Sequence, residues 1–181
     1  MGRTLPSISP TTLKSLLTSS STNALQKLRV LRDASLNELV NSTLTLLQKE
    51  AEHSGVEIRR DLDPDLPDVG VDRDQIRQVL LNVALNGIQA MPKGGVLEVK
   101  SMREEADLAV EVSDNGPGLE DQELDRVFDP FFTTKPRGTG LGLSISDQLV
   151  QSHGGRISAR RNAGGGMTFR IELPVAPPTA G

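Results

Sequence analysis

Glycine is crowded into the second half of this 181-residue chain, and no other property of the sequence limits the possible folds as strongly. More than half of the 17 glycines lie between Gly116 and Gly166. They form four groups, at 116–118, 138–142, 154–155 and 164–166. Glycine adopts positive φ without strain and lets a backbone approach a ligand closely. This half of the chain is therefore expected to turn sharply several times or to approach a ligand.

Apolar spacing and capping signals predict an α+β fold. Helices are predicted from Ser35 to about Gly55, from Asp72 to Pro92 and from Leu141 to Ser152. Alternating apolar and polar residues predict strands at 56–62, 68–71, 96–102, 108–112, 155–160 and 167–173. The long segment after Ser113 contains only a short predicted helix, at 121–128. This order favours a two-layer α/β sandwich, a mixed and mostly antiparallel sheet covered on one face by helices.

The two ends of the chain differ from its middle. Residues 1–34 are rich in Ser and Thr and are expected to be a linker, and 174–181 a flexible tail, which leaves a domain at 35–173. A formal charge of −4 argues against a nucleic-acid partner, and no apolar run approaches the length of a membrane span. Cysteine is absent, so thiolate metal sites and cysteine nucleophiles are excluded.

The predicted helix from Asp72 to Pro92 carries a stripe of amides. Asn82 and Asn86 are spaced i, i+4 and share one face, with Gln89 one turn further on. Such residues usually form a solvated helix face. A carboxamide oxygen also ligates Mg²⁺, a hard cation that shares phosphate ligands. Both interpretations stay open at this point.

Two glycine motifs suit a nucleotide. Asp114 follows a strand and precedes the turn 115–119, so its carboxylate is placed to accept a hydrogen bond from an adenine amino group, although a surface turn explains the motif equally well. Residues 138–144 lead into a helix, whose first N–H groups suit phosphate oxygens. This second motif lacks the Lys-Ser/Thr of a P-loop and the strand context of a Rossmann fold, so both folds are disfavoured.

Between these motifs lie three of the four aromatic residues, Phe128, Phe131 and Phe132. Permanent exposure of all three is unfavourable, so they are expected to dock onto the domain or onto a partner. Lys135 and Arg137 follow them and supply the local positive charge that a polyphosphate needs. Taken alone, the segment is more simply interpreted as a hydrophobic anchor for a long loop.

In this order, the segments resemble the nucleotide-binding catalytic domain of sensor histidine kinases, in the superfamily shared with DNA gyrase and MutL. The asparagine box is matched at 82–91, the first glycine box at 114–119, the phenylalanine box at 128–132 and the second glycine box at 138–143. Residues 164–169 are similar to the last glycine-rich strand of the family, and 86–92 with 129–135 look closest to its nitrogen-regulator-like branch. The resemblance covers 35–173 and implies a Bergerat-type fold that binds ATP and Mg²⁺.

The resemblance also implies roles for single residues. Asn86 would ligate Mg²⁺ between the phosphates, Asp114 would bind the adenine amino group, and Lys135 would face the phosphates. Gly116 and Gly118 would let the backbone turn beneath the base. The second glycine box would face the phosphates through Gly138, Thr139, Gly140, Leu141, Gly142 and Leu143, while Thr168 would line the purine pocket and most of 119–140 would form a lid.

Position 82 separates hydrolysis from phosphoryl transfer. ATP-hydrolysing relatives have a glutamate there as general base, whereas the carboxamide of Asn82 is not a base at neutral pH. The resemblance therefore implies a kinase in which Asn82, Asn86 and Lys135 act by positioning and charge neutralisation, with slow hydrolysis. A nucleotide-binding regulator without transfer and an anti-sigma-type serine kinase are the alternatives.

The acceptor histidine of such kinases is not evident. Neither His53 nor His153 is followed by the acidic residue and proline of the acceptor motif. The resemblance thus implies transfer to a histidine of a phosphoacceptor and dimerisation domain, in trans or in the full-length protein, with a response regulator as indirect partner. Residues 1–34 would then be a linker or the remnant of dimerisation helices. The chain is expected to be monomeric and cytoplasmic, whether or not its parent protein is anchored in a membrane.

Overall fold

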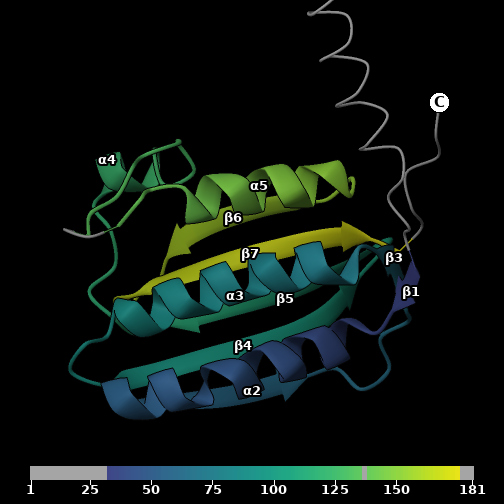
Figure 1. Cartoon of the computed structure of the whole chain (residues 1–181), viewed down its shortest axis with the longest axis horizontal. Coiled ribbons are helices and arrows are strands. Elements are labelled where there is room, and N and C mark those ends of the chain that lie inside the picture. Colours follow the sequence, from purple (N-terminus) through teal and green to yellow (C-terminus); the bar gives the residue numbers. More distant parts are fainter. Residues whose placement is uncertain (1–31, 136–137, 176–181) are drawn as a thin grey trace, which may run out of the picture. The chain divides into compact units, whose positions relative to one another are not determined.

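A five-stranded sheet forms one layer of the computed structural model, which describes residues 32–135 and 138–175 (Figure 1). Its strands are β2 (Val56–Leu62), β4 (Gly95–Glu104), β5 (Asp107–Asp114), β6 (Arg156–Arg161) and β7 (Met167–Pro174). They are ordered β2-β4-β5-β7-β6; β2 and β4 are parallel, and the other neighbouring pairs are antiparallel. The prediction of a mixed, mostly antiparallel sheet is confirmed.

Three helices cover one face of this sheet: α2 (Leu36–Ser54), α3 (Arg73–Gln89) and α5 (Gly142–Ser152) (Figure 1). Apolar residues of the helices pack against those of the strands in one core, in which Ile76, Val83 and Ile88 of α3 are fully buried. Leu97 of β4 and Val110 of β5 belong to the same core. The predicted two-layer α+β sandwich is therefore confirmed.

The caps that the sequence predicted fix where these helices begin and end. The hydroxyl of Ser35 accepts the Glu38 N–H at 3.4 Å at the start of α2, and Gly55 ends this helix with a φ of 69°. The carboxylate of Asp72 accepts the N–H groups of Asp74 and Gln75 at 3.1 and 3.2 Å at the start of α3. The Asp72 cap thus fixes the residue at which α3, the helix with the amide stripe, begins.

Two short elements differ from the sequence expectation. Strand β1 (Arg32–Ala34) pairs antiparallel with β3 (Val69–Val71) in a separate two-stranded sheet, although its residues were expected in the linker. The Arg-Asp-Ala sequence of β1 contains no β-branched residue, unlike the Val-Gly-Val of β3, so nothing in it indicates a strand. Helix α4 (Asp121–Leu124) is shorter than predicted. Residues 1–31 and 176–181 lie outside the described residues, and the domain boundaries at 34–35 and 173–174 stay predictions.

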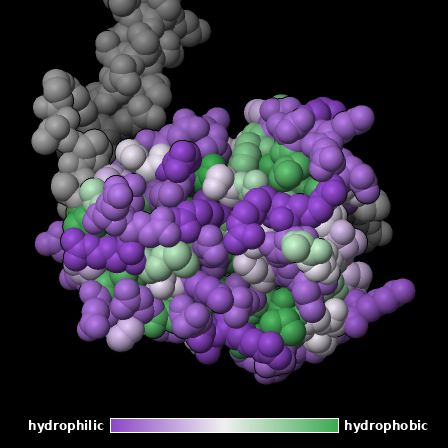
Figure 2. Space-filling view, turned by 180° about the vertical axis from the view of Figure 1, so that it is seen from behind, coloured by the Kyte–Doolittle hydropathy of each residue, from purple (hydrophilic) through white to green (hydrophobic). Residues whose placement is uncertain are grey.

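The face of the sheet opposite the helices is predominantly hydrophilic (Figure 2). Arg170 of β7 forms ion pairs there with Glu104, Glu111 and Glu172. Isolated and fully exposed ion pairs usually contribute less than about 1 kcal/mol each, whereas these pairs are partly buried and share one guanidinium. Within the described residues, no helix is long and apolar enough to cross a membrane.

His153 joins the end of α5 to the start of α3. It is 3% exposed, its Nδ1 lies 2.8 Å from the carbonyl oxygen of Leu149, and its Nε2 accepts the backbone N–H of Asp72 at 3.1 Å. His153→Leu removes this acceptor and is expected to lower the free energy of unfolding by about 1–3 kcal/mol in urea denaturation. The exposed His53→Leu control is expected to change it by less than about 0.5 kcal/mol. Equal effects of the two variants would contradict this role of His153.

Candidate functional site

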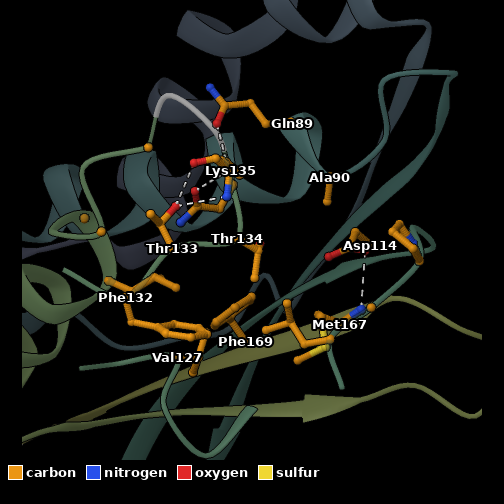
Figure 3. Close-up of a pocket in the computed structure, with 18 of the residues that line it drawn as sticks. Gln89, Ala90, Asp114, Val127, Phe132, Thr133, Thr134, Lys135, Met167 and Phe169 are labelled. Carbon is orange, nitrogen blue, oxygen red and sulfur yellow. Dashed lines mark hydrogen bonds between the residues drawn. The ribbon is translucent and has the colours of Figure 1, made fainter. Parts of the chain in front are cut away.

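A cavity of about 370 Å³ lies between α3, the loop 115–141 and the ends of β5 and β7. Its volume falls within the range of small-molecule sites. Most of the residues proposed from sequence line it: Asn86, Asp114, Gly118, Lys135, Gly138, Thr139, Gly140, Gly142 and Leu143. Figure 3 shows Asp114 on one side of the cavity and Lys135 with Gln89 on the other. The cavity therefore has two chemically different ends.

Asp114 provides a fixed acceptor at the first end. The residue is 5% exposed, and its Oδ1 accepts the N–H groups of Gly116 at 2.9 Å and Met167 at 3.3 Å. Burial raises the pKa of the carboxyl, and the two backbone N–H bonds oppose that shift. Both bonds go to Oδ1, and Figure 3 shows a carboxylate oxygen pointing into the cavity. Asp114 is thus held by the backbone while it keeps acceptor capacity for a ligand.

Thr168 does not line the cavity, unlike most of the site residues predicted from sequence. Its neighbours in β7, Met167 and Phe169, face the cavity, and successive side chains of a strand point to opposite faces. The Thr168 hydroxyl instead lies 2.7 Å from the Ser113 hydroxyl and donates to Asn162 Oδ1 at 2.7 Å. Alternation in the predicted strand 167–173 groups Met167 with Phe169 on the face opposite Thr168, and this signal could have found the two residues.

The positively charged side chain of Lys135 lies at the second end of the cavity. The Lys135 ammonium donates to Asn86 Oδ1 and to Gln89 Oε1, both at 2.8 Å. Burial lowers the pKa of Lys135, and neither of these two partners carries a charge. Gln89 was not among the predicted site residues, although its i+3 spacing from Asn86 places it on the same face of α3.

The donor set at this end fits a divalent cation shared with phosphates. Mg²⁺ binds few protein oxygens, keeps waters and takes phosphate ligands. The Asn86 Oδ1 lines the cavity and already faces the positive charge of Lys135. The Asn86 carboxamide oxygen, which lies beside an open cavity and already contacts the Lys135 ammonium, therefore suits a metal that takes few protein ligands.

The start of α5 also lines this end of the cavity. Gly140, Gly142 and Leu143 line the cavity, and α5 begins without a side-chain cap. Backbone N–H groups of an uncapped first turn are suited to phosphate oxygens. Leu141 occupies the N-cap position of α5 and does not line the cavity. Gly116 does not line the cavity either, and its N–H donates to Asp114.

Asn82 contacts α5 and does not line the cavity. Its Nδ2 donates to the carbonyl oxygen of Gly142 and to the hydroxyl of Ser146, both at 3.2 Å. Asn82 therefore holds the start of α5 against α3. Its place in the structure is that of a positioning residue, one helical turn before Asn86.

Two of the three clustered phenylalanines dock onto the domain. Phe128 packs edge-on against Phe169 with ring centroids 6.4 Å apart, and Phe132 lines the cavity. Phe131 is 75% exposed and has a φ of 67°, and its N–H donates to the carbonyl oxygen of Gly140 at 2.9 Å. A Cβ at Gly140 would lie 2.3 Å from the Phe131 carbonyl carbon, so only glycine fits at this contact.

Known proteins are similar to this chain in sequence and in fold. Residues 71–177 match the family of histidine kinase-, DNA gyrase B-, and HSP90-like ATPases. The sensor histidine kinase ZraS of Escherichia coli K12 is 39% identical over 145 residues, which are 80% of this chain and 31% of ZraS. The nucleotide-free catalytic domain of histidine kinase ThkA has a TM-score of 0.75 at 32% identity, covering 80% of this chain and 95% of that domain. ThkA in complex with the response regulator protein TrrA has a TM-score of 0.73 at 27% identity, covering 94% of this chain and 50% of that one.

The chain belongs to this ATPase family. Within the family it is a catalytic ATP-binding domain of the sensor histidine kinase type. It spans about a third of the length of curated relatives such as ZraS.

Proposed function

We propose that this domain binds ATP together with Mg²⁺ and transfers the γ-phosphate to a histidine supplied by another domain or another chain. The observation that carries the proposal is a single cavity with the acceptor Asp114 at one end and the cation Lys135 at the other. A neutral base with an amino group matches the first end. A polyphosphate matches the second end.

At the adenine end, the carboxylate of Asp114 would accept a hydrogen bond from the 6-amino group. Ala90, Leu119, Val127, Met167 and Phe169 supply apolar walls around it. Such walls suit the flat faces of a purine, while the single carboxylate fixes its orientation.

At the phosphate end, Asn86 would hold Mg²⁺ and Lys135 would contact the phosphates. The metal would neutralise charge on the phosphates, and the uncapped start of α5 would donate N–H groups to them. Lys135 would exchange its two amide partners for phosphate oxygens. The part of Gln89 would be to hold the ammonium near Asn86 until the nucleotide arrives.

Lys135→Met is expected to weaken ATP binding about 10-fold, because it removes a charged hydrogen-bond donor from the phosphate end. Adenosine lacks the phosphates, so its affinity is expected to stay unchanged. Calorimetric titration of both ligands measures the two effects, with the exposed Lys93→Met as the control. Equal losses for ATP and adenosine would show that Lys135 does not act on the phosphates.

Transfer is favoured over hydrolysis because no base stands at position 82. The imidazole of the acceptor histidine would attack the γ-phosphorus while the bond to the β-phosphate oxygen breaks and ADP leaves. Asn82 is occupied with Gly142 and Ser146 and is not placed to activate water. His153 is buried between α5 and α3, which supports an acceptor from outside this domain.

A response regulator would receive the phosphate from that histidine. The structure of ThkA with TrrA is a precedent for such an assembly in a related kinase. Because ATP is the substrate, the domain would act in the cytoplasm, in a parent protein that is either soluble or anchored in a membrane.

Labelled ATP tests the proposal. The domain is incubated with γ-labelled ATP, Mg²⁺ and a panel of isolated phosphoacceptor domains that includes the one of ZraS. Acid-labile, alkali-stable label on an acceptor is the expected result. Acid-stable label would indicate a serine kinase, and tight ATP binding without label on any acceptor would indicate a regulatory module.

A further inference from the structure

The turn between β6 and β7 contacts the adenine end of the cavity from behind. This turn comprises Asn162–Gly166 and lies next to the last residue of β5, Asp114. Asn162 reaches it directly, because its Nδ2 donates to the Asp114 carbonyl oxygen at 3.1 Å. Asn162 itself does not line the cavity.

A chain of hydrogen bonds fixes the Asn162 side chain. Its Oδ1 accepts the Thr168 hydroxyl at 2.7 Å and Arg160 Nη1 at 3.3 Å. Thr168 is 1% exposed, and its hydroxyl lies 2.7 Å from that of Ser113. Asn162 therefore connects β7 to the residue that ends β5, using both its acceptor and its donor atoms.

The backbone of the same turn brings a second group to Asp114. Asn162 N–H donates to the Gly166 carbonyl oxygen at 3.0 Å, and Gly165 N–H donates to the Asn162 carbonyl oxygen at 3.1 Å. Gly166 has a φ of 84°, and a Cβ there would lie 2.0 Å from the Asp114 carbonyl oxygen. The next residue, Met167, donates its N–H to the Asp114 carboxylate. Closure of this turn thus determines where that N–H lies.

We propose that Asn162 is a positioning residue for base selectivity, which holds Asp114 in the orientation that accepts the purine 6-amino group. The proposal rests on the proposed function, since it takes Asp114 as the group that binds adenine. Asn162 fixes the main chain of Asp114 from one side and, through the turn, the N–H that holds its carboxylate Oδ1 from the other. Thr168, placed in the purine pocket from sequence, acts one step further back by orienting Asn162.

Selectivity between purine bases follows from these two constraints on Asp114. A hydrogen bond loses strength steeply when its donor and acceptor are misaligned. An Asp114 that rotates freely would still accept water, so it would favour a 6-amino purine less strongly over an unsubstituted one. The phosphate end lies across the cavity and does not depend on the orientation of Asp114.

Two nucleotides that differ only in the 6-amino group test the proposal. ATP and purine riboside 5′-triphosphate are titrated calorimetrically in the presence of Mg²⁺, and the ratio of their affinities is the readout. Asn162→Ala is expected to lower this ratio about 10-fold, and Thr168→Val about 3-fold. Asn162→Asp keeps the acceptor contacts to Thr168 and Arg160 and loses the donor to Asp114, so it is expected to lower the ratio as much as Asn162→Ala.

Asn37 offers a matched control. Its Nδ2 donates to the Asp63 carbonyl oxygen at 2.7 Å, and its Oδ1 accepts the Ser101 hydroxyl at 2.7 Å, remote from the cavity. Asn37→Ala is expected to lower thermal stability and leave the ratio unchanged. A wild-type ratio near one would refute the proposed adenine site itself. A high wild-type ratio that persists in both Asn162 variants would overturn the positioning role, and circular dichroism verifies that these variants are folded.

Discussion

Asp114→Asn is expected to weaken ATP binding by about 100-fold while the domain stays folded. The Asn side chain retains one oxygen, which the N–H groups of Gly116 and Met167 already require. Its NH₂ group would then face the adenine amino group, so that two donors meet and no hydrogen bond forms. Calorimetric titration with ATP and Mg²⁺ measures the loss. Asp107→Asn, at the exposed opposite end of β5, is the control and is expected to bind ATP like the wild type.

The stability of Asp114→Asn, unlike its affinity for ATP, is expected not to fall. Burial raises the pKa of Asp114 above its value in the unfolded chain, so the folded state binds more protons than the unfolded state between these two values. The stability that this carboxyl contributes at low pH is therefore lost as the pH rises through that window. At pH 7, Asp114→Asn is expected to be at least as stable as the wild type in thermal unfolding. A variant that is both less stable and unable to bind ATP would instead indicate a structural role.

Asn86→Ala is expected to reduce phosphoryl transfer by at least about 100-fold, the upper end of the loss from removing a group that merely supports a metal ligand. ATP affinity is expected to lose its dependence on Mg²⁺ as well, because the substitution removes the oxygen proposed to hold the metal. Transfer to an acceptor domain and calorimetric titration with and without Mg²⁺ measure these effects.

The control for this variant is Asn41→Ala, which removes an exposed asparagine from α2. It is expected to leave both transfer and Mg²⁺ dependence unchanged. An Asn86→Ala protein whose ATP affinity still rises with Mg²⁺ would show that another group holds the metal.

The sequence predicted most of the fold because its signals are local. Ser35 and Asp72 cap the helices that they were expected to cap, and the strand from 167 to 173 was recognised from its alternation. Strand β1 was missed because its Arg-Asp-Ala sequence carries no strand signal, and its pairing with Val69–Val71 is remote in sequence. The alternation of β7 separates Thr168 from Met167 and Phe169, but alternation alone does not say which face of a strand borders a cavity.

The candidate site was predicted less completely, because its contacts join segments far apart in the sequence. Asp114, Asn86 and Lys135 do line one cavity. The contact between Lys135 and Gln89 spans 46 positions, and the one between Asn162 and Asp114 spans 48. Neither contact follows from spacing or capping, and both depend on how the loop and the turn fold back onto the sheet.

Helix α3 holds several residues of the candidate site on one rigid element. It bears Asn86 and Gln89, and through Asn82 it holds the first turn of α5. A small displacement of this helix along its axis would shift Asn86, the proposed metal ligand, together with the first turn of α5, while Asp114 would stay in place in β5. Core substitutions beneath α3, such as at Val83 or Ile88, are therefore expected to change phosphoryl transfer more than the choice of base.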